Sequence, residues 1–372
     1  MNTLRSETTP YPETSGLPGW PDASSLPAWP ASAPVEACFV ESPLQARALI
    51  TRHSLEVSSN SLTPELFWAT VEAGKWRPRV VCVKREGRTV GLVYLKERLL
   101  AGVPTGLVHG DFSMRSKVDA AERDRDFVLS RALDFLFSRG RVFGAILYMP
   151  PNELPRGVFS HVADRANLKL TYSDAVARHS RLLLPDTYES FLQSLGQHTR
   201  RNLRYYRRRF EGAGHSYLPD LARNDFQTIA RELQGKSRIP AGNMVQRSLD
   251  ILDSAARPLV WALRGSDGRW LSVLTGWREE GKVTLVMQMN SDLAHPRDSI
   301  SMVLRGYVLE SLIEAGVHTV DFWWGLAGPL ALYARSYPAV NVTLQSKVLH
   351  RKMMGKLLNS MNTRCPTLLR KV

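Results

Sequence analysis

Asp321 is the residue best placed for acid–base chemistry in this sequence. It lies in the segment HTVDFWWG, where strand alternation puts Thr319, Asp321 and Trp323 on one face. A carboxylate between aromatic side chains can have a raised pKa and act as a general base. The alternative is a structural aspartate that accepts hydrogen bonds from local donors. Trp323 is either a core residue or a platform for a ligand.

Tyr333 lies in the loop that follows and is a candidate hydrogen-bond donor to a developing oxyanion or a leaving thiolate. Packing of the loop is the alternative for Tyr333 and Tyr337. His318 is near Asp321, but alternation directs it to the opposite face. No histidine has the spacing of a metal site, and there is no nucleophile elbow and no Walker loop. We therefore expect no metal.

A segment rich in arginine comes before these residues in the sequence and is expected to form a cationic helix. The segment RLLLPDTYESFLQSLGQHTRRNLRYYRRRFEGAG begins with a strand at 181–184, breaks at a Pro-Asp pair, and continues as a helix over 188–211. Its apolar residues share one stripe and its arginines another. A solvated basic face is the simplest interpretation. The alternative is recognition of a substrate phosphate or carboxylate by Arg200, Arg201 and Arg204.

Composition indicates a globular chain of about two domains, because its 372 residues have enough apolar content for sizeable cores. The net charge of +14 favours a polyanionic partner, such as a nucleotide cofactor, RNA or an anionic polysaccharide. The start of the chain lacks the apolar core of a signal peptide, and no apolar run is long enough to span a bilayer. Cysteines without paired spacing fit a reducing compartment, so we expect a cytoplasmic protein.

The two ends of the chain differ from its middle. Residues 1–34 are rich in proline and predict a disordered leader. Residues 348–372 carry cations between apolar residues at mixed helical spacing. This basic tail predicts a docking helix with a loose end, or alternatively an amphipathic helix that binds a surface.

The middle of the chain repeats one unit at a period of roughly 175 to 180 residues. Each copy shows a hairpin, a third strand, a helix ending at a glycine, and a fourth strand. The expected elements are 80–84, 90–95, 103–109, 124–139 and 142–148 in the first copy, and 259–263, 270–277, 283–289, 298–315 and 317–324 in the second. We therefore expect an α+β fold with mixed sheets flanked by helices, in domains 35–170 and 171–347.

This order, together with the arginine-rich segment between the copies, resembles the tandem GNAT-like acyltransferases related to the Fem-type peptidyltransferases. The resemblance is closest to their CelD-like branch, which is linked to cellulose and exopolysaccharide synthesis. The family has a first sequence motif in the arginine-rich segment, and this chain matches it at Thr199, Arg200, Asn202, Leu203, Arg204, Arg208, Glu211 and Gly214. A second family motif has an aspartate and a glycine at the end of the last repeat strand, followed by a tyrosine and a cation. This chain is similar to it at Asp321, Gly325, Tyr333 and Arg335. The resemblance implies two tandem GNAT-like (acyl-CoA N-acyltransferase) domains.

The resemblance also implies where an acyl donor binds. In this fold the pantetheine arm lies between two splayed strands, with the pyrophosphate at the start of the next helix. In the second copy, the residues expected at that place are Arg297, Ser299, Ser301 and Gln288. No glycine occurs between Gly281 and Gly306, and Asp298 would repel phosphates that it faced. The first copy is acidic at its helix start, which favours a structural or acceptor-shaping role.

The expected function is transfer of an acyl group from acyl-CoA to an amine or hydroxyl of a sugar, a polysaccharide precursor or an amino-acid derivative. Asp321 and Tyr333 are the expected catalytic residues. The expected substrate-binding residues are Arg200, Arg201, Arg204, Trp323, Gly325 and Arg335. Two alternatives stay open: a catalytically degenerate pair that binds an anionic partner such as RNA or polysaccharide, and a transferase with an aminoacyl-tRNA donor.

Overall fold

The computed structural model describes residues 34–57, 62–72, 75–237, 242–292, 298–323, 325–326 and 328–347. The expected leader, apart from its last residue, and the expected basic tail lie outside the described residues. The same holds for Arg297, which was expected to bind the donor, and for Trp324.

The first copy of the repeated unit has the expected order of elements. Its elements are β1 (Val35–Val40), α1 (Pro43–His53), α2 (Pro64–Glu72), β2 (Trp76–Arg85), β3 (Arg88–Leu100), β4 (Val103–Asp111), β5 (Lys117–Ala120), α3 (Arg125–Ser138), β6 (Gly144–Met149) and α4 (Arg156–Arg165). The β2–β3 turn places Glu86 at φ 53° and Gly87 at φ 74°, as a tight hairpin requires. Strand β6 then returns parallel to β4.

The second copy repeats this order. Its elements are β8 (Ser216–Leu218), α7 (Arg223–Leu233), α8 (Gly242–Ser254), β9 (Pro258–Arg264), β10 (Trp270–Glu279), β11 (Lys282–Asn290), α9 (Ile300–Glu314) and β12 (Thr319–Phe322). Strands β9, β10 and β11 form an antiparallel meander, and β12 returns parallel to β11. Helix α9 ends at Glu314, and Gly316 just beyond it has φ 70°, a backbone conformation that favours glycine.

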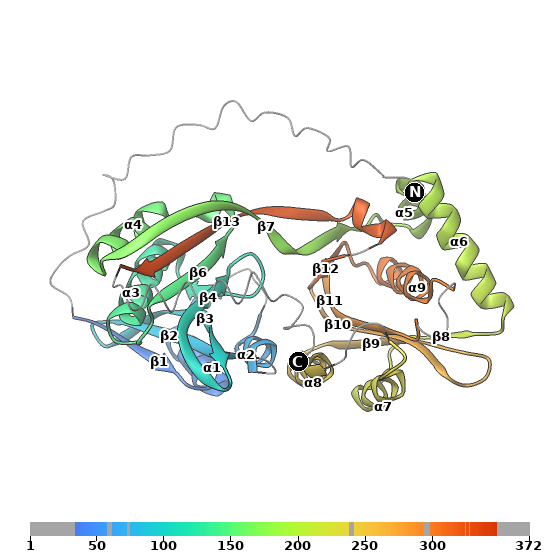
Figure 1. Ribbon diagram of the computed structural model, residues 1–372, viewed down its shortest axis with the longest axis horizontal. Helices are drawn as coiled ribbons and strands as arrows, with labels where there is room; N and C mark the ends of the chain where they lie inside the picture. The colour runs from blue at the N-terminus through green and yellow to red at the C-terminus, as the bar shows by residue number, and fades with distance from the viewer. Residues whose placement is uncertain are drawn as a thin grey trace, which may run out of the picture. The chain divides into compact units, whose positions relative to one another are not determined.

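Two long strands join the copies into one continuous sheet. The strands are β7 (Leu168–Leu183) and β13 (Arg335–Ser346), and they run side by side (Figure 1). Strand β13 pairs with β6 of the first copy, whereas the end of β7 pairs with β12 of the second. The strand order is β1-β2-β3-β4-β6-β13-β7-β12-β11-β10-β9-β8. The boundary expected after residue 170 therefore falls inside β7, and the end of the expected second domain completes the sheet of the first copy.

The segment between the copies is not the single helix that we expected over 188–211. It forms α5 (Tyr188–Ser194) and α6 (Gln197–Gly212). Leu195 and Gly196 between them are extended, with ψ near 144° and 149°. Leu195 is 2% exposed, and the hydroxyl of Tyr333 accepts a hydrogen bond from the Gly196 amide at 2.6 Å. Burial of Leu195 and this contact accompany the break.

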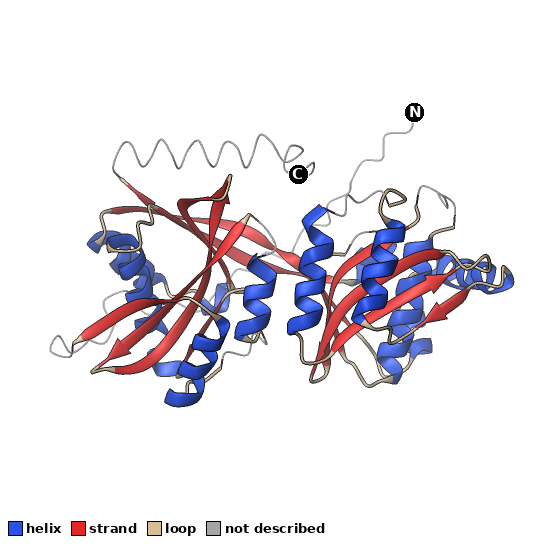
Figure 2. Cartoon of the chain, turned by 90° about the horizontal axis from the view of Figure 1, so that it is seen from below, coloured by secondary structure: helices blue, strands red, loops and turns tan. Residues whose placement is uncertain are grey.

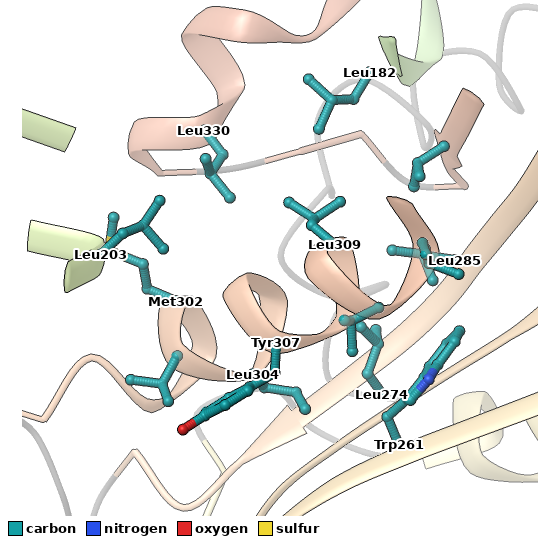
Figure 3. Close-up of a cluster of buried hydrophobic side chains, with 14 of the residues drawn as sticks. Leu182, Leu203, Trp261, Leu274, Leu285, Met302, Leu304, Tyr307, Leu309 and Leu330 are labelled. Atoms are coloured by element: carbon teal, nitrogen blue, oxygen red, sulfur yellow. The ribbon is translucent and has the colours of Figure 1, made fainter. Parts of the chain in front are cut away.

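Helices cover both faces of the second copy's sheet (Figure 2). On one face, α5, α6 and α9 build a core with Leu203, Leu309 and Leu285, as Figure 3 shows. On the other face, α7 and α8 pack over Trp277 and Trp323, together with residues of α2 from the first copy. The sheet therefore separates the arginine-rich helix from the side of β12 that carries Trp323.

Candidate functional site

Five residues of neighbouring strands form a row across the sheet. The pairing register places Trp277 opposite Thr284, Thr284 opposite Asp321, Asp321 opposite Arg181, and Arg181 opposite Arg335. Side chains of directly paired residues point to the same face of a sheet. The row therefore brings Asp321 and Arg335, two residues singled out in the sequence, to either side of Arg181.

Asp321 is buried, with 1% of its surface exposed, and its carboxylate binds Arg181. Arg181 donates from Nε to Oδ1 at 2.6 Å and from Nη2 to Oδ2 at 2.8 Å. Lys282 Nζ lies 3.9 Å from Oδ2. The hydrogen bonds to Asp321 raise the pKa of Arg181. Both oxygens of Asp321 are therefore engaged, an arrangement that favours a role in positioning over the role of general base that we expected.

The row borders a cavity of about 390 Å³. Both copies contribute to it, because Ser113 and Met114 follow β4 of the first copy and the strand residues belong mainly to the second. Its lining residues are Leu62, Ser113, Met114, Arg181, Trp277, Glu279, Glu280, Lys282, Thr284, Asp321 and Trp323. Charges of both signs and two indole rings thus face one space, which is typical of a site for a small polar ligand.

Trp323 is a fixed wall of this cavity. Its ring meets that of Trp277 edge to face at 5.4 Å between centroids. The guanidinium of Arg115 lies 4.6 Å above the Trp323 ring, and its Nη2 donates to the Trp323 carbonyl at 2.8 Å. Gly325, also expected in the site, has φ 81° and donates to the carbonyl of Phe322, so it turns the chain after β12. Arg115 ties the first copy to the end of this strand.

The arginines of α6 lie on the other side of the sheet from Asp321. Arg204 binds both carboxylate oxygens of Glu189, at 2.9 and 3.0 Å, and Arg209 pairs with Asp298 at 3.0 Å. Arg200 and Arg201 form no ion pair within the described residues. Of the three arginines of α6 that were expected to bind substrate, Arg204 is thus paired internally.

Tyr333 lies beside the start of α6, away from the cavity. It ends a short helical turn (Pro329–Tyr333) and packs against the core that contains Leu203. Its hydroxyl accepts the hydrogen bond from Gly196 described above. Asp321 and Tyr333, the two expected catalytic residues, therefore lie on opposite sides of the sheet, and the structure does not bring them together.

Strand β12 ends before β11 does, at the place where the resemblance puts an acyl donor. They pair only from Lys282 to Leu285, and β11 continues through residues 286–290 beyond the end of β12. In the first copy, β4 and β6 stay paired up to Asp111. The second copy therefore leaves the last residues of β11 without β12 as a neighbour.

Gln288 and Ser299, two of the residues expected around the donor, lie in different environments. Gln288 is held in a buried network, where its Oε1 accepts from Arg305 at 2.8 Å and its Nε2 donates to Asn290 at 3.0 Å and to the carbonyl of Ser301 at 3.2 Å. Burial lowers the pKa of Arg305 to about 10. Ser299 is left-handed, with φ 46°, at the start of α9. Gln288 therefore shapes the strand and helix start through a network rather than as an open ligand.

His179 is a residue that the sequence analysis missed. It lies in β7, is 3% exposed, and stacks on Tyr337 with 5.9 Å between ring centroids. Burial lowers its pKa, against the attraction of Asp111 and Asp321. No local motif marks it, because its neighbours come from strands far away in the sequence. Its place two residues before Arg181 on a long strand was the only available signal.

The comparisons with known proteins agree with this architecture. No protein-family model and no curated protein sequence matches the chain. Among solved structures, the chain is similar to FemX, with a TM-score of 0.52, 11% identity, and coverage of 82% of this chain and 96% of that one. It is also similar to L-PGS from Bacillus licheniformis, with a TM-score of 0.50, 12% identity, and coverage of 87% and 96%. The fold is GNAT-like.

A third similar structure is a conserved protein of unknown function from Bacteroides thetaiotaomicron VPI-5482, with a TM-score of 0.53, 11% identity, and coverage of 84% and 100%. These similarities confirm the expected fold class, a mixed sheet flanked by helices in two copies. At such identities they concern the fold alone, and the CelD-like branch stays a prediction.

The described residues contain no group of three or more histidine, cysteine, aspartate or glutamate side chains arranged to hold a metal ion. No described helix is long and apolar enough to cross a membrane.

Proposed function

We propose that this chain is an acyltransferase that moves an acyl group from acyl-CoA to an amine or hydroxyl of a sugar, a polysaccharide precursor or an amino-acid derivative. The observation that carries the proposal is that β12 ends at Phe322, opposite Leu285, whereas β11 continues to Asn290 without β12 as its partner. In the GNAT-like fold the gap between the two corresponding strands accepts the pantetheine arm of the donor. The fold likeness to FemX and L-PGS supports the same class of reaction.

The donor would cross the sheet through this gap. Helix α9 starts at Ile300 on one side, and its free amide groups favour a phosphate there. Asp298, which by itself would repel a pyrophosphate, pairs with Arg209 at 3.0 Å. Trp323 and the cavity lie on the other side of the sheet. A thioester passed between the strands would therefore reach the cavity while its phosphates stay near α9.

The cavity is the proposed site of the acceptor. Its two indole rings can pack against the apolar face of a sugar or an aliphatic chain, and its charged groups can bind hydroxyls, amines or carboxylates. The Arg181–Asp321 pair fixes the floor of the cavity, and Lys282 adds a cation beside it. We assign Trp323 to the wall of the acceptor site, Arg335 to its border beside Arg181, and Gly325 to the turn that ends β12.

The transfer itself needs few groups. The acceptor nitrogen or oxygen forms a bond to the acyl carbon, the carbon–sulfur bond breaks, and the proton of the acceptor leaves to a base. Holding donor and acceptor in one cavity converts a bimolecular reaction into a step within a single complex, which favours the reaction strongly. The fixed side chains of the row provide that orientation.

Ser301 offers a sharp test of the donor site because it lies in the first turn of α9. We expect Ser301→Asp to raise the KM for acyl-CoA at least about tenfold, since a carboxylate repels the phosphates. An acidic residue in the first turn stabilises a helix, so the change should not unfold the protein. Ser301→Ala is the matched control and should keep the KM within about twofold of wild type.

The assay measures thiol release from acetyl-CoA, butyryl-CoA and palmitoyl-CoA, with glucosamine and amino acids as acceptors. Turnover that Ser301→Asp weakens and Ser301→Ala keeps would support the proposal. Equal KM values for all three proteins would place the donor elsewhere. Absence of turnover and binding with every thioester would contradict acyl-CoA as the donor.

Binding of a polyanion is a second candidate function, supported by a separate observation. Arg200 and Arg201 form no ion pair within the described part of the chain, and the exposed Tyr205 lies on the same helix. Such a surface suits RNA, including an aminoacyl-tRNA donor, or an anionic polysaccharide. Replacing Arg200 and Arg201 by alanine should lower the slope of log affinity against log salt by about two for tRNA.

The control for that experiment removes the same charge elsewhere, by replacing the exposed Arg52 and Arg88 with alanine. Binding that both double variants weaken equally would indicate a diffuse electrostatic attraction and would contradict a specific surface on α6.

A further inference from the structure

His179 lies at an irregularity where β7 passes from the sheet of the first copy to that of the second. Pro338 of β13 pairs with Val176, but Ser336 pairs with Ser180, so residues 177–179 of β7 oppose Tyr337 alone. A bulge of this kind bends a strand and changes the direction of its side chains, and such bulges are frequent beside active sites. His179 is the residue of the bulge next to the cavity row.

The imidazole of His179 is buried and incompletely bonded. The residue is 3% exposed, and its Nδ1 has no hydrogen-bond partner among the described residues. A buried ring nitrogen without a partner destabilises the fold. The ring is held by stacking on Tyr337, at 5.9 Å and an angle of 23° between planes. A nitrogen left free at such a cost is a candidate for contact with a ligand.

The charges that act on His179 are those of the cavity and its border. Asp321 and Arg181 line the cavity, Arg115 covers Trp323, and Asp111 lies two residues before the lining residue Ser113. Tyr337 of β13 faces the ring as well. The two carboxylates favour the protonated ring, whereas burial and the two guanidinium groups oppose it, so burial lowers the pKa overall. The lowered pKa favours the neutral ring, which can accept a proton.

We propose that His179 is the base of the transfer step, an inference that rests on the acyltransferase function proposed above. The acceptor nitrogen or oxygen attacks the acyl carbon and gives its proton to Nδ1 of His179, while the carbon–sulfur bond of the thioester breaks. The imidazolium is stabilised by Asp111 and Asp321 and returns the proton to the leaving thiolate. The acyl group and the proton are thus both accounted for, and the reaction requires no further reactant.

The kinetic test uses the full chain and the thiol-release assay with acetyl-CoA and the amine that wild type accepts best. His179→Gln should lower kcat at least about a hundredfold, the usual range for loss of a general base, and change the KM for acetyl-CoA less than about threefold. The acidic limb of the pH–rate profile should disappear, and added imidazole should restore part of the rate. His318→Gln is the matched control, because His318 is exposed and should leave rate and pH profile unchanged.

Kinetics of His179→Gln equal to those of wild type, with the same pH profile, would overturn the proposal. A loss of rate that imidazole does not restore, with the pH profile unchanged, would also overturn it, since that result indicates a structural role.

A second measurement is independent of turnover and so separates this proposal from the acyltransferase proposal. Nuclear magnetic resonance of histidine labelled with ¹³C and ¹⁵N, with the signal assigned by its absence in His179→Gln, follows the ring of the intact chain with pH. A neutral ring at pH 7 that titrates below the ordinary value supports a base. A ring that is protonated at pH 7.5 would overturn the proposal, whichever donor the protein uses.

Discussion

Arg181 determines how the carboxylate of Asp321 is used, and no spacing in the sequence connects these two residues. Strand alternation placed Asp321 and Trp323 on one face, and the cavity that both residues line agrees with this placement. The partner of Asp321 depends on β7 lying beside β12, which is a long-range pairing. His179 was missed for the same reason. Residue types and alternation could therefore be predicted, whereas the contacts that set their chemistry could not.

Replacing Asp321 with asparagine tests the ion pair. Asparagine keeps the shape but faces Arg181 with an amide that cannot accept both hydrogen bonds, so the free energy of unfolding should fall by about 2 to 3 kcal/mol. Glu189→Gln is the control, because its pair with Arg204 is exposed and should contribute less than about 1 kcal/mol. Urea denaturation measures both values. Equal losses in the two variants would show that burial adds nothing to the Asp321 pair.

His179 should make stability depend on pH in one direction. Its pKa is lowered in the folded chain, and the unfolded value is about 6.5. As the pH falls through that unfolded value, the unfolded chain takes up a proton before the folded chain does. Stability is therefore lost as the pH falls, with about 1.4 kcal/mol for each unit of pKa difference.

Thermal denaturation at pH 7.5 and 5.5 compares wild type with His179→Gln. Wild type should lose more stability than the variant between the two values. A variant that loses as much or more than wild type would contradict a lowered pKa of His179.

At the scale of elements, the hairpins and the crossover helices of both copies followed from alternation, turn residues and the terminal glycine. The break between α5 and α6 did not, because the helical spacing continues through Leu195 and Gly196 and only tertiary contacts interrupt it. The irregularity in β10 could not be predicted from the sequence either. There the register shifts between Thr275 and Gly276, just before Trp277 of the cavity.

Gly276 should be required for this irregularity. A Cβ at Gly276 would clash with the carbonyl oxygen of Thr284, which is backbone of the neighbouring strand. We expect Gly276→Ala to destabilise the protein by at least about 2 kcal/mol, because the strands must move apart. At Gly212, where nothing lies within 4 Å, alanine should change the unfolding free energy by less than about 1 kcal/mol. Comparable denaturation midpoints for the two variants would contradict this account of β10.

At the scale of the whole molecule, the duplication could be predicted from the period of the sequence, but the sharing of strands between the copies could not. Strand β13 follows the second copy in sequence and lies between β6 and β7 in the sheet. Strand partners so distant in sequence leave no local pattern, since any alternating segment can pair with another. The predicted domain boundary therefore marks the repeat in sequence rather than an interruption of the sheet.

This shared sheet predicts that the copies unfold together. Leu344 of β13 is fully buried, and its strand neighbours are Ala145 and Leu170. Leu344→Ala should lower the free energy of unfolding by about 2 to 4 kcal/mol and keep a single transition in calorimetry, because β7 and β13 link both copies. Two transitions, of which only one shifts, would show that the copies unfold independently.

The central claim is that an acyl-CoA donor binds in the second copy, between β11 and β12 at the start of α9. Hydrogen–deuterium exchange of the intact chain, with and without saturating acetyl-CoA, tests it most directly because the exchange reports position as well as binding. The account predicts slower exchange in residues 286–290 and in the first turns of α9, with little change in α3. Protection confined to α3 of the first copy, or no protection anywhere with acetyl-CoA, would contradict it.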